Sequence, residues 1–109
     1  GWRRQFDSDP RHSDDLLKNM KQSGVYILQS TKNSSYYIGS TNDITTRINY
    51  HNSGRVKGTR NIYPLIILVF IICKNTTEAR QAEYRLKKYK RRDILEKVIK
   101  DGVFPWQYN

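Results

Sequence analysis

Two tyrosines in matching short tripeptides are the side chains best placed to share a site. Tyr26 ends the tripeptide GVY and Tyr37 begins the tripeptide YIG, with ten residues between them. A polar stretch, residues 30–35, separates two apolar, tyrosine-rich runs, which predicts a β-hairpin. If position 26 pairs with 39 and 28 with 37, both phenols project from one face; a register shifted by one residue puts them on opposite faces. The alternative is that both are ordinary half-buried strand tyrosines.

An arginine and a histidine follow on one face of the next predicted element. Ile44, Arg47, Ile48 and His51 have the i, i+3, i+4, i+7 spacing of a helix, predicted over residues 43–52 with its N-cap supplied by the polar stretch 40–43. Because the isoleucines must face the core, Arg47 is expected to point inward, where its planar, permanently charged guanidinium can bind a phosphate group. His51 shares this face and can orient a water, protonate a leaving group or simply satisfy a nearby carbonyl.

A carboxylate is predicted beside the apolar face of a later helix. Glu83 lies four residues after Ala79 and three before Leu86. Such a carboxylate needs a partner, and Mg²⁺ suits it because that ion keeps several waters and takes only one or two protein carboxylates. The alternative is an i, i+4 ion pair with Lys87 on a solvated edge, contributing about 0.3 to 0.5 kcal/mol. The phenols, Arg47 and Glu83 are expected to converge on one concave basic pocket. Together they would meet the needs of phosphodiester hydrolysis: an activated water, positive charge at the phosphoryl oxygens and help for the leaving oxygen.

The charge of the chain predicts a polyanionic partner. The net charge is +10, and residues 22–109 hold fifteen basic against six acidic side chains, whereas residues 1–21 hold five against four. Basic residues interleaved with tyrosines favour nucleic acid, and a solvated face kept for solubility is the alternative. The expected nucleic-acid-binding residues form a loop group and a helical group: Arg55, Lys57 and Arg60, then Lys87, Lys88, Lys90, Arg91 and Arg92.

The remaining elements predict one α+β domain. Strands are expected at residues 24–29, 35–39 and 65–73, the last an apolar run needing cover on both faces. Further helices are expected from a capping box at Asn75 and Glu78, and over residues 93–100, with Gly102 as terminator. The segment from Phe104 to Trp106 is expected to fold back as an apolar clasp. The result is a three-stranded antiparallel sheet flanked by helices.

Length and cysteine content limit the cellular setting. The apolar run at 65–73 is about half as long as a membrane span, so no membrane is expected. The single cysteine, Cys73, excludes an internal disulfide and favours a reducing cytoplasm. Residues 1–21 have no apolar periodicity and are expected to be a poorly ordered leader, either native or added for expression, with the domain proper at 22–109.

The spacing of the two tripeptides, GVY followed after ten residues by YIG, resembles the signature of the GIY-YIG nuclease superfamily. Arg47 ten residues after Tyr37, His51 one helical turn later and Glu83 after the apolar strand match the same pattern. The resemblance covers roughly residues 22–100 and is greatest to the small standalone members. Ser40 stands where some members have a lysine after YIG, so Lys57 or Arg60 is expected to supply that positive charge.

The resemblance implies a metal-dependent endonuclease that hydrolyses DNA with Mg²⁺ or Mn²⁺ held by Glu83, leaving a 5′-phosphate and a 3′-hydroxyl. It implies that Tyr26 is the general base, a poor one at its ordinary pKa of about 10, so Arg47 and the metal are expected to lower that pKa. Tyr37 is expected to hold the water or the phosphate. Because no reader module accompanies the small domain, we expect weak sequence specificity and a preference for branched, flapped or single-stranded structure. A non-catalytic binding module and an RNA substrate remain open.

Overall fold

The computed structural model describes residues 22–107. In chain order it contains β1 (Gly24–Ser30), β2 (Tyr36–Thr41), α3 (Ile44–Asn52), β3 (Leu65–Ile72), α4 (Thr76–Lys87), α5 (Arg92–Asp101) and a short 3₁₀ helix η1 (Pro105–Gln107). The observed ends differ from the expected ones by at most two residues. The expected leader at 1–21 lies outside the described residues.

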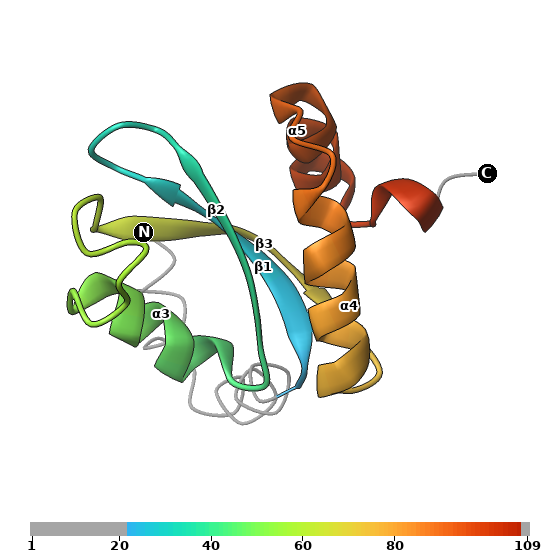
Figure 1. Cartoon of the computed structure of the whole chain (residues 1–109), viewed down its shortest axis with the longest axis horizontal. Coiled ribbons are helices and arrows are strands. Elements are labelled where there is room, and N and C mark those ends of the chain that lie inside the picture. The colour runs from blue at the N-terminus through green and yellow to red at the C-terminus, as the bar shows by residue number, and fades with distance from the viewer. Residues whose placement is uncertain (1–21, 108–109) are drawn as a thin grey trace, which may run out of the picture.

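The strands form one antiparallel sheet in the order β2-β1-β3, with α3 on one side and α4 and α5 on the other (Figure 1). The predicted α+β class is confirmed. Tyr26 pairs with Gly39 and Leu28 with Tyr37. This is the predicted register that places both phenols on the same face of the sheet.

The central strand β1 supplies side chains to two cores. Val25 and Ile27 pack with residues of α4, α5 and the C-terminal segment, including Leu86, while Tyr26 and Leu28 pack with residues of α3 and β3. Alternation along one strand therefore sends Tyr26 to the α3 side and its neighbours to the α4 side. This division decides which site residues can meet.

The expectation that both faces of the long apolar strand are covered is wrong. β3 is an edge strand, and Ile66 and Ile72 are 42% and 50% exposed. The fully covered strand is instead β1, whose residues are almost all buried. A continuous apolar run indicates high β-propensity, but it does not show whether the strand is central.

Side-chain caps and a glycine set the helix ends as expected. The Asp43 carboxylate accepts a hydrogen bond from the Thr46 amide at the start of α3, and the Asn75 side chain accepts one from the Glu78 amide at the start of α4. Gly102 ends α5 in the left-handed conformation, with φ of 71°. Residues 57–60 form turns in the loop after α3.

The C-terminal segment closes the α4 side of the domain. Phe104 is buried and stacks on Trp106, with ring centroids 4.7 Å apart, and the Arg85 guanidinium lies 4.3 Å from the Trp106 ring centroid. The predicted clasp is confirmed. Within residues 22–107, no helix combines the length and apolarity required to span a membrane.

Candidate active site

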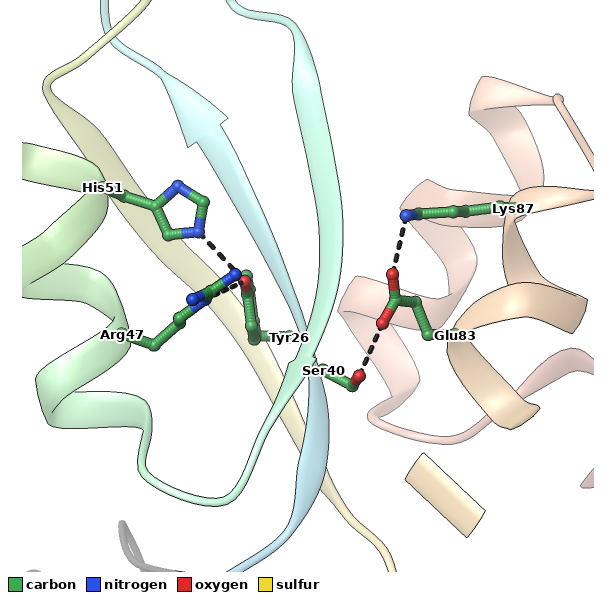
Figure 2. Close-up of polar contacts among 6 residues, drawn as sticks. All are labelled: Tyr26, Ser40, Arg47, His51, Glu83 and Lys87. Carbon is green, nitrogen blue, oxygen red and sulfur yellow. Dashed lines mark hydrogen bonds and ion pairs between the residues drawn. The ribbon is translucent and has the colours of Figure 1, made fainter. Parts of the chain in front are cut away.

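The Tyr26 hydroxyl is the centre of a polar cluster between β1 and α3. Its oxygen lies 2.9 Å from His51 Nε2 and accepts a longer hydrogen bond, 3.4 Å, from Arg47 Nε (Figure 2). Arg47 and His51 stand one turn apart on α3, so both reach toward the same strand. The tyrosine is 1% exposed. The predicted inward orientation of Arg47 and His51 is confirmed.

Two glycines allow the backbone to pack closely against aromatic rings, one of which is the Tyr26 phenol. A Cβ at Gly39, which pairs with Tyr26, would overlap the phenol oxygen and ring. A Cβ at Gly24 would come within 2.6 Å of the Phe70 ring and of the Ile71 carbonyl oxygen. The glycines of both tripeptides are therefore needed for close packing.

His51 is fully buried and uncharged at neutral pH. Burial, followed by the charge of Arg47, lowers its pKa to about 4. Its Nδ1 lies 2.7 Å from the hydroxyl oxygen of Thr59, itself fully buried. Among residues 22–107 the phenol hydrogen has no acceptor other than Nε2, because the second partner of the hydroxyl, Arg47, can only donate. This direction leaves the hydrogen of the neutral imidazole on Nδ1, where it donates to Thr59. Sequence reasoning missed Thr59, for which the only signal was that a buried histidine needs two partners.

The pKa of Tyr26 is raised above its ordinary value. Burial is the largest cause, and it outweighs the hydrogen bond and charge of Arg47, which act in the opposite direction. Arg47 therefore acts on Tyr26 in the expected sense without producing a net lowering. The phenol carries its proton at neutral pH.

Tyr37 completes the aromatic part of the cluster. Its ring centroid lies 6.5 Å from that of Tyr26 and 4.9 Å from that of His51. Its ring is half-buried, and the chain at Gly58 passes so close that a Cβ there would lie 3.2 Å from the ring. Among residues 22–107, the Tyr37 hydroxyl has no hydrogen-bond partner, so it can bond to a bound molecule.

Glu83 lies on the other side of β2 from this cluster (Figure 2). Ser40 follows Gly39, so its side chain faces α4, where its hydroxyl donates to Glu83 Oε1 at 2.5 Å. Lys87 Nζ lies 2.6 Å from Glu83 Oε2, and the two side chains are 48% and 22% exposed, respectively. The expected convergence of the tyrosines, Arg47 and Glu83 on one pocket is wrong as stated, because alternation along β2 separates them. The alternative, an i, i+4 ion pair between Glu83 and Lys87, is formed.

The carboxylate nevertheless acts electrostatically on the cluster. Its negative charge contributes to raising the pKa of both Tyr26 and Arg47, as the smallest of the causes in each case. The two parts of the site are therefore close enough to sense one charge across the edge strand.

The donor set fits a divalent cation held through one carboxylate. Among the described residues, no three histidine, cysteine or acidic side chains converge to form a protein cage. Mg²⁺ needs no such cage, because water and substrate oxygens fill most of its positions. Glu83 is the partly exposed carboxylate that fits, provided that Lys87 moves aside. Lys87, rather than Lys57 or Arg60, is the cation that the structure places beside it.

The predicted basic residues lie in two groups on opposite sides of the sheet. In the loop after α3, Arg55 lies over the Tyr50 ring, and among residues 22–107 none of the loop group forms an ion pair. In the helical group, Arg91 pairs with Asp93 at 2.7 Å and Arg92 lies 3.9 Å from Glu96. Lys88 lies over the Tyr84 ring. All of the loop and helical basic residues are exposed.

Comparison with known proteins identifies a family for this chain. The family model described as the GIY-YIG catalytic domain matches residues 22–100, which include every residue of the cluster. The chain belongs to the GIY-YIG family. A UPF0213 protein of Clostridium perfringens is 39% identical over 72% of this chain and 85% of its own length. A UPF0213 protein of Bacillus cereus is 36% identical over 73% of this chain and 84% of its own length. A UPF0213 protein of Oceanobacillus iheyensis is 35% identical over 72% of this chain and 91% of its own length. No solved structure matches.

Membership gives the chain a nuclease domain of the GIY-YIG type and places it with small standalone members. It makes nucleic acid the class of substrate, and divalent metals are the general cofactors of GIY-YIG nucleases. Gly24 and Gly39, where a Cβ would clash, are the glycines of the two tripeptides that correspond to GIY and YIG in the family name.

Proposed function

We propose that this protein is a metal-dependent endonuclease that hydrolyses DNA phosphodiester bonds with weak sequence specificity. The observation that carries the proposal is the Tyr26 hydroxyl, buried between the Arg47 guanidinium and the neutral His51 imidazole. A buried tyrosine kept only for packing needs one hydrogen-bond partner for its hydroxyl, but it does not need a cation such as Arg47. An arginine with no ion-pair partner among residues 22–107 is suited to an incoming phosphate.

In the proposed reaction, Tyr26 relays a proton. Water attacks phosphorus and passes a proton to the phenol oxygen as the phenol passes its own proton to His51 Nε2. The bond from phosphorus to the 3′ oxygen breaks, and the leaving oxygen takes a proton from solvent, which gives a 5′-phosphate and a 3′-hydroxyl. A phosphate at Arg47 offsets the charge that helps to lower the His51 pKa, so substrate binding makes the imidazole a better acceptor.

The other residues bind and orient the substrate. Arg47 would hold the phosphoryl oxygens, and the Tyr37 hydroxyl would hold the water or the phosphate. Glu83 would hold Mg²⁺ or Mn²⁺, which when bound supplies positive charge to the phosphoryl group. Ser40 orients the carboxylate, and Lys87 balances its charge in the absence of the ion.

A nicking assay tests the proposal. Supercoiled plasmid is incubated with the protein in Mg²⁺, Mn²⁺ or EDTA, beside branched, flapped and RNA oligonucleotides. We expect cleavage of DNA that needs the metal and is faster on branched or flapped forms. If only RNA is cleaved, the substrate is RNA rather than DNA. If the protein binds these nucleic acids but cleaves none of them, it is a non-catalytic binding module of the same fold.

A further inference from the structure

An open pocket of about 400 Å³ lies beside Arg47, on the α3 side of the domain. It is lined by Arg47, Tyr50, Arg55 and Val56. Two of these residues carry positive charge, and none is acidic. The pocket volume falls within the usual range for small-molecule sites.

The loop that forms one wall is held against α3. The Tyr50 carbonyl accepts hydrogen bonds from the amides of Ser53 and Arg55, at 3.3 and 3.2 Å. The Arg55 guanidinium lies 5.6 Å from the Tyr50 ring centroid, yet the tyrosine remains 41% exposed. The wall is therefore ordered while the aromatic ring keeps an accessible surface.

This combination suits one nucleotide unit. Guanidinium groups bind phosphate through paired hydrogen bonds, and an exposed aromatic ring offers a surface on which any base can stack. A base inside a continuous duplex has both faces covered by its neighbours, so only an unpaired or displaced base can use the Tyr50 ring.

We propose that this pocket binds an unpaired nucleotide of DNA next to the phosphodiester that is cut, with its base on Tyr50 and its phosphate between Arg55 and Arg47. The inference rests on the proposed nuclease function. Arg47 connects the two, because it lines the pocket and also donates to the Tyr26 hydroxyl. The pocket would therefore select flaps, branches or single-stranded segments at the cleavage position.

The test uses three versions of one oligonucleotide: fully paired, unpaired beside the cut, and the unpaired version with an abasic residue at that position. Single-turnover cleavage is measured for wild type, Tyr50→Phe and Tyr50→Ala, with Tyr84→Ala as the control, since Tyr84 is 64% exposed on α4. We expect Tyr50→Ala to slow cleavage of the unpaired substrate by about 5- to 150-fold, the effect of one lost base–aromatic stack. Tyr50→Phe and Tyr84→Ala should cleave the unpaired substrate at the wild-type rate. On the abasic substrate, wild type and Tyr50→Ala should have the same rate.

Equal cleavage of all three substrates by wild type, or an equal loss on all three in Tyr50→Ala, would overturn the proposal. A second readout separates it from the proposed function. With 2-aminopurine at the unpaired position and EDTA present, binding should quench the fluorescence in wild type and not in Tyr50→Ala. Quenching without cleavage would reject the nuclease function and support nucleotide binding in the pocket. Cleavage without quenching would support the nuclease function and reject nucleotide binding in the pocket.

Discussion

The pKa of Tyr26 is subject to two opposing effects, the charge of Arg47 and burial. The Arg47 cation favours the phenolate, whereas burial favours the neutral phenol and has the larger effect on the pKa. His51 is uncharged and can accept the proton without first losing one. These protonation states favour a proton relay, in which Tyr26 gives up its proton only as it receives another.

The buried His51 makes stability depend on pH. Its pKa is about 4 in the folded protein and near 6.5 when unfolded, so between these values the unfolded chain binds more protons. Stability should thus fall as pH drops from 6.5 toward 4, by roughly 3 kcal/mol from this group. His51→Gln should be less stable at pH 7 but show a flatter profile. Urea unfolding of both proteins from pH 7 to 4.5 measures the difference, and parallel profiles would contradict the predicted burial of a neutral imidazole.

At the scale of elements, β2 divides the site by alternation. Gly39 faces Tyr26 and Ser40 faces Glu83, so consecutive residues of one edge strand serve the two parts. The α3 helix supplies Arg47 and His51, and α4 supplies the carboxylate. Small movements of β2 would therefore change both halves together.

Gly39→Ala tests this dependence. The added methyl would overlap the Tyr26 phenol, so the ring must shift away from His51 and Arg47. We expect a loss of about 1 to 3 kcal/mol in stability, as for overpacking of a core, and loss of cleavage. Thermal melting and nicking rate are measured on the same samples, with Ser35→Ala, in the hairpin turn, as a control. A variant with wild-type stability and activity would show that the close contact is unimportant.

Sequence reasoning recovered the elements well because caps, glycines and periodicity are local signals. Asp43, Asn75 and Gly102 act as expected, and Arg47 and His51 face inward because Ile44 and Ile48 do. Three features depended on tertiary structure instead. These were the edge position of β3, the bond between Thr59 and His51, and the separation of Glu83 from Tyr26, because strand order and long-range partners leave no periodic mark in a sequence.

At the scale of the whole molecule, positive charge is divided between the two sides of the sheet. The helical group has acidic partners at Lys87, Arg91 and Arg92, whereas among residues 22–107 the loop group has none. The loop group also borders the pocket at Arg47. The loop side is therefore expected to dominate contact with DNA phosphates.

Two triple variants that each remove three charges test this expectation. Arg55, Lys57 and Arg60 are changed to glutamine in one, and Lys87, Arg91 and Arg92 in the other. DNA affinity is measured across salt concentrations, since each phosphate contact contributes about 0.9 to the log–log slope. We expect the loop variant to flatten the slope by up to about 3 and the helical variant to change it less. Equal flattening, or none in the loop variant, would contradict the expectation.

The proposed function requires that Tyr26 and Glu83 act on one phosphodiester from the two sides of β2. The most direct measurement is the single-turnover nicking rate in Mg²⁺ of wild type, Tyr26→Phe and Glu83→Gln, at a temperature where all three are folded and with DNA affinity determined on the same samples. Both variants should lose at least about 100-fold in rate. Glu83→Gln should bind DNA as tightly as wild type or more so, because a negative charge is removed near the phosphate. Metal-dependent nicking at the wild-type rate in both variants would contradict the assignment of the chemistry to these residues.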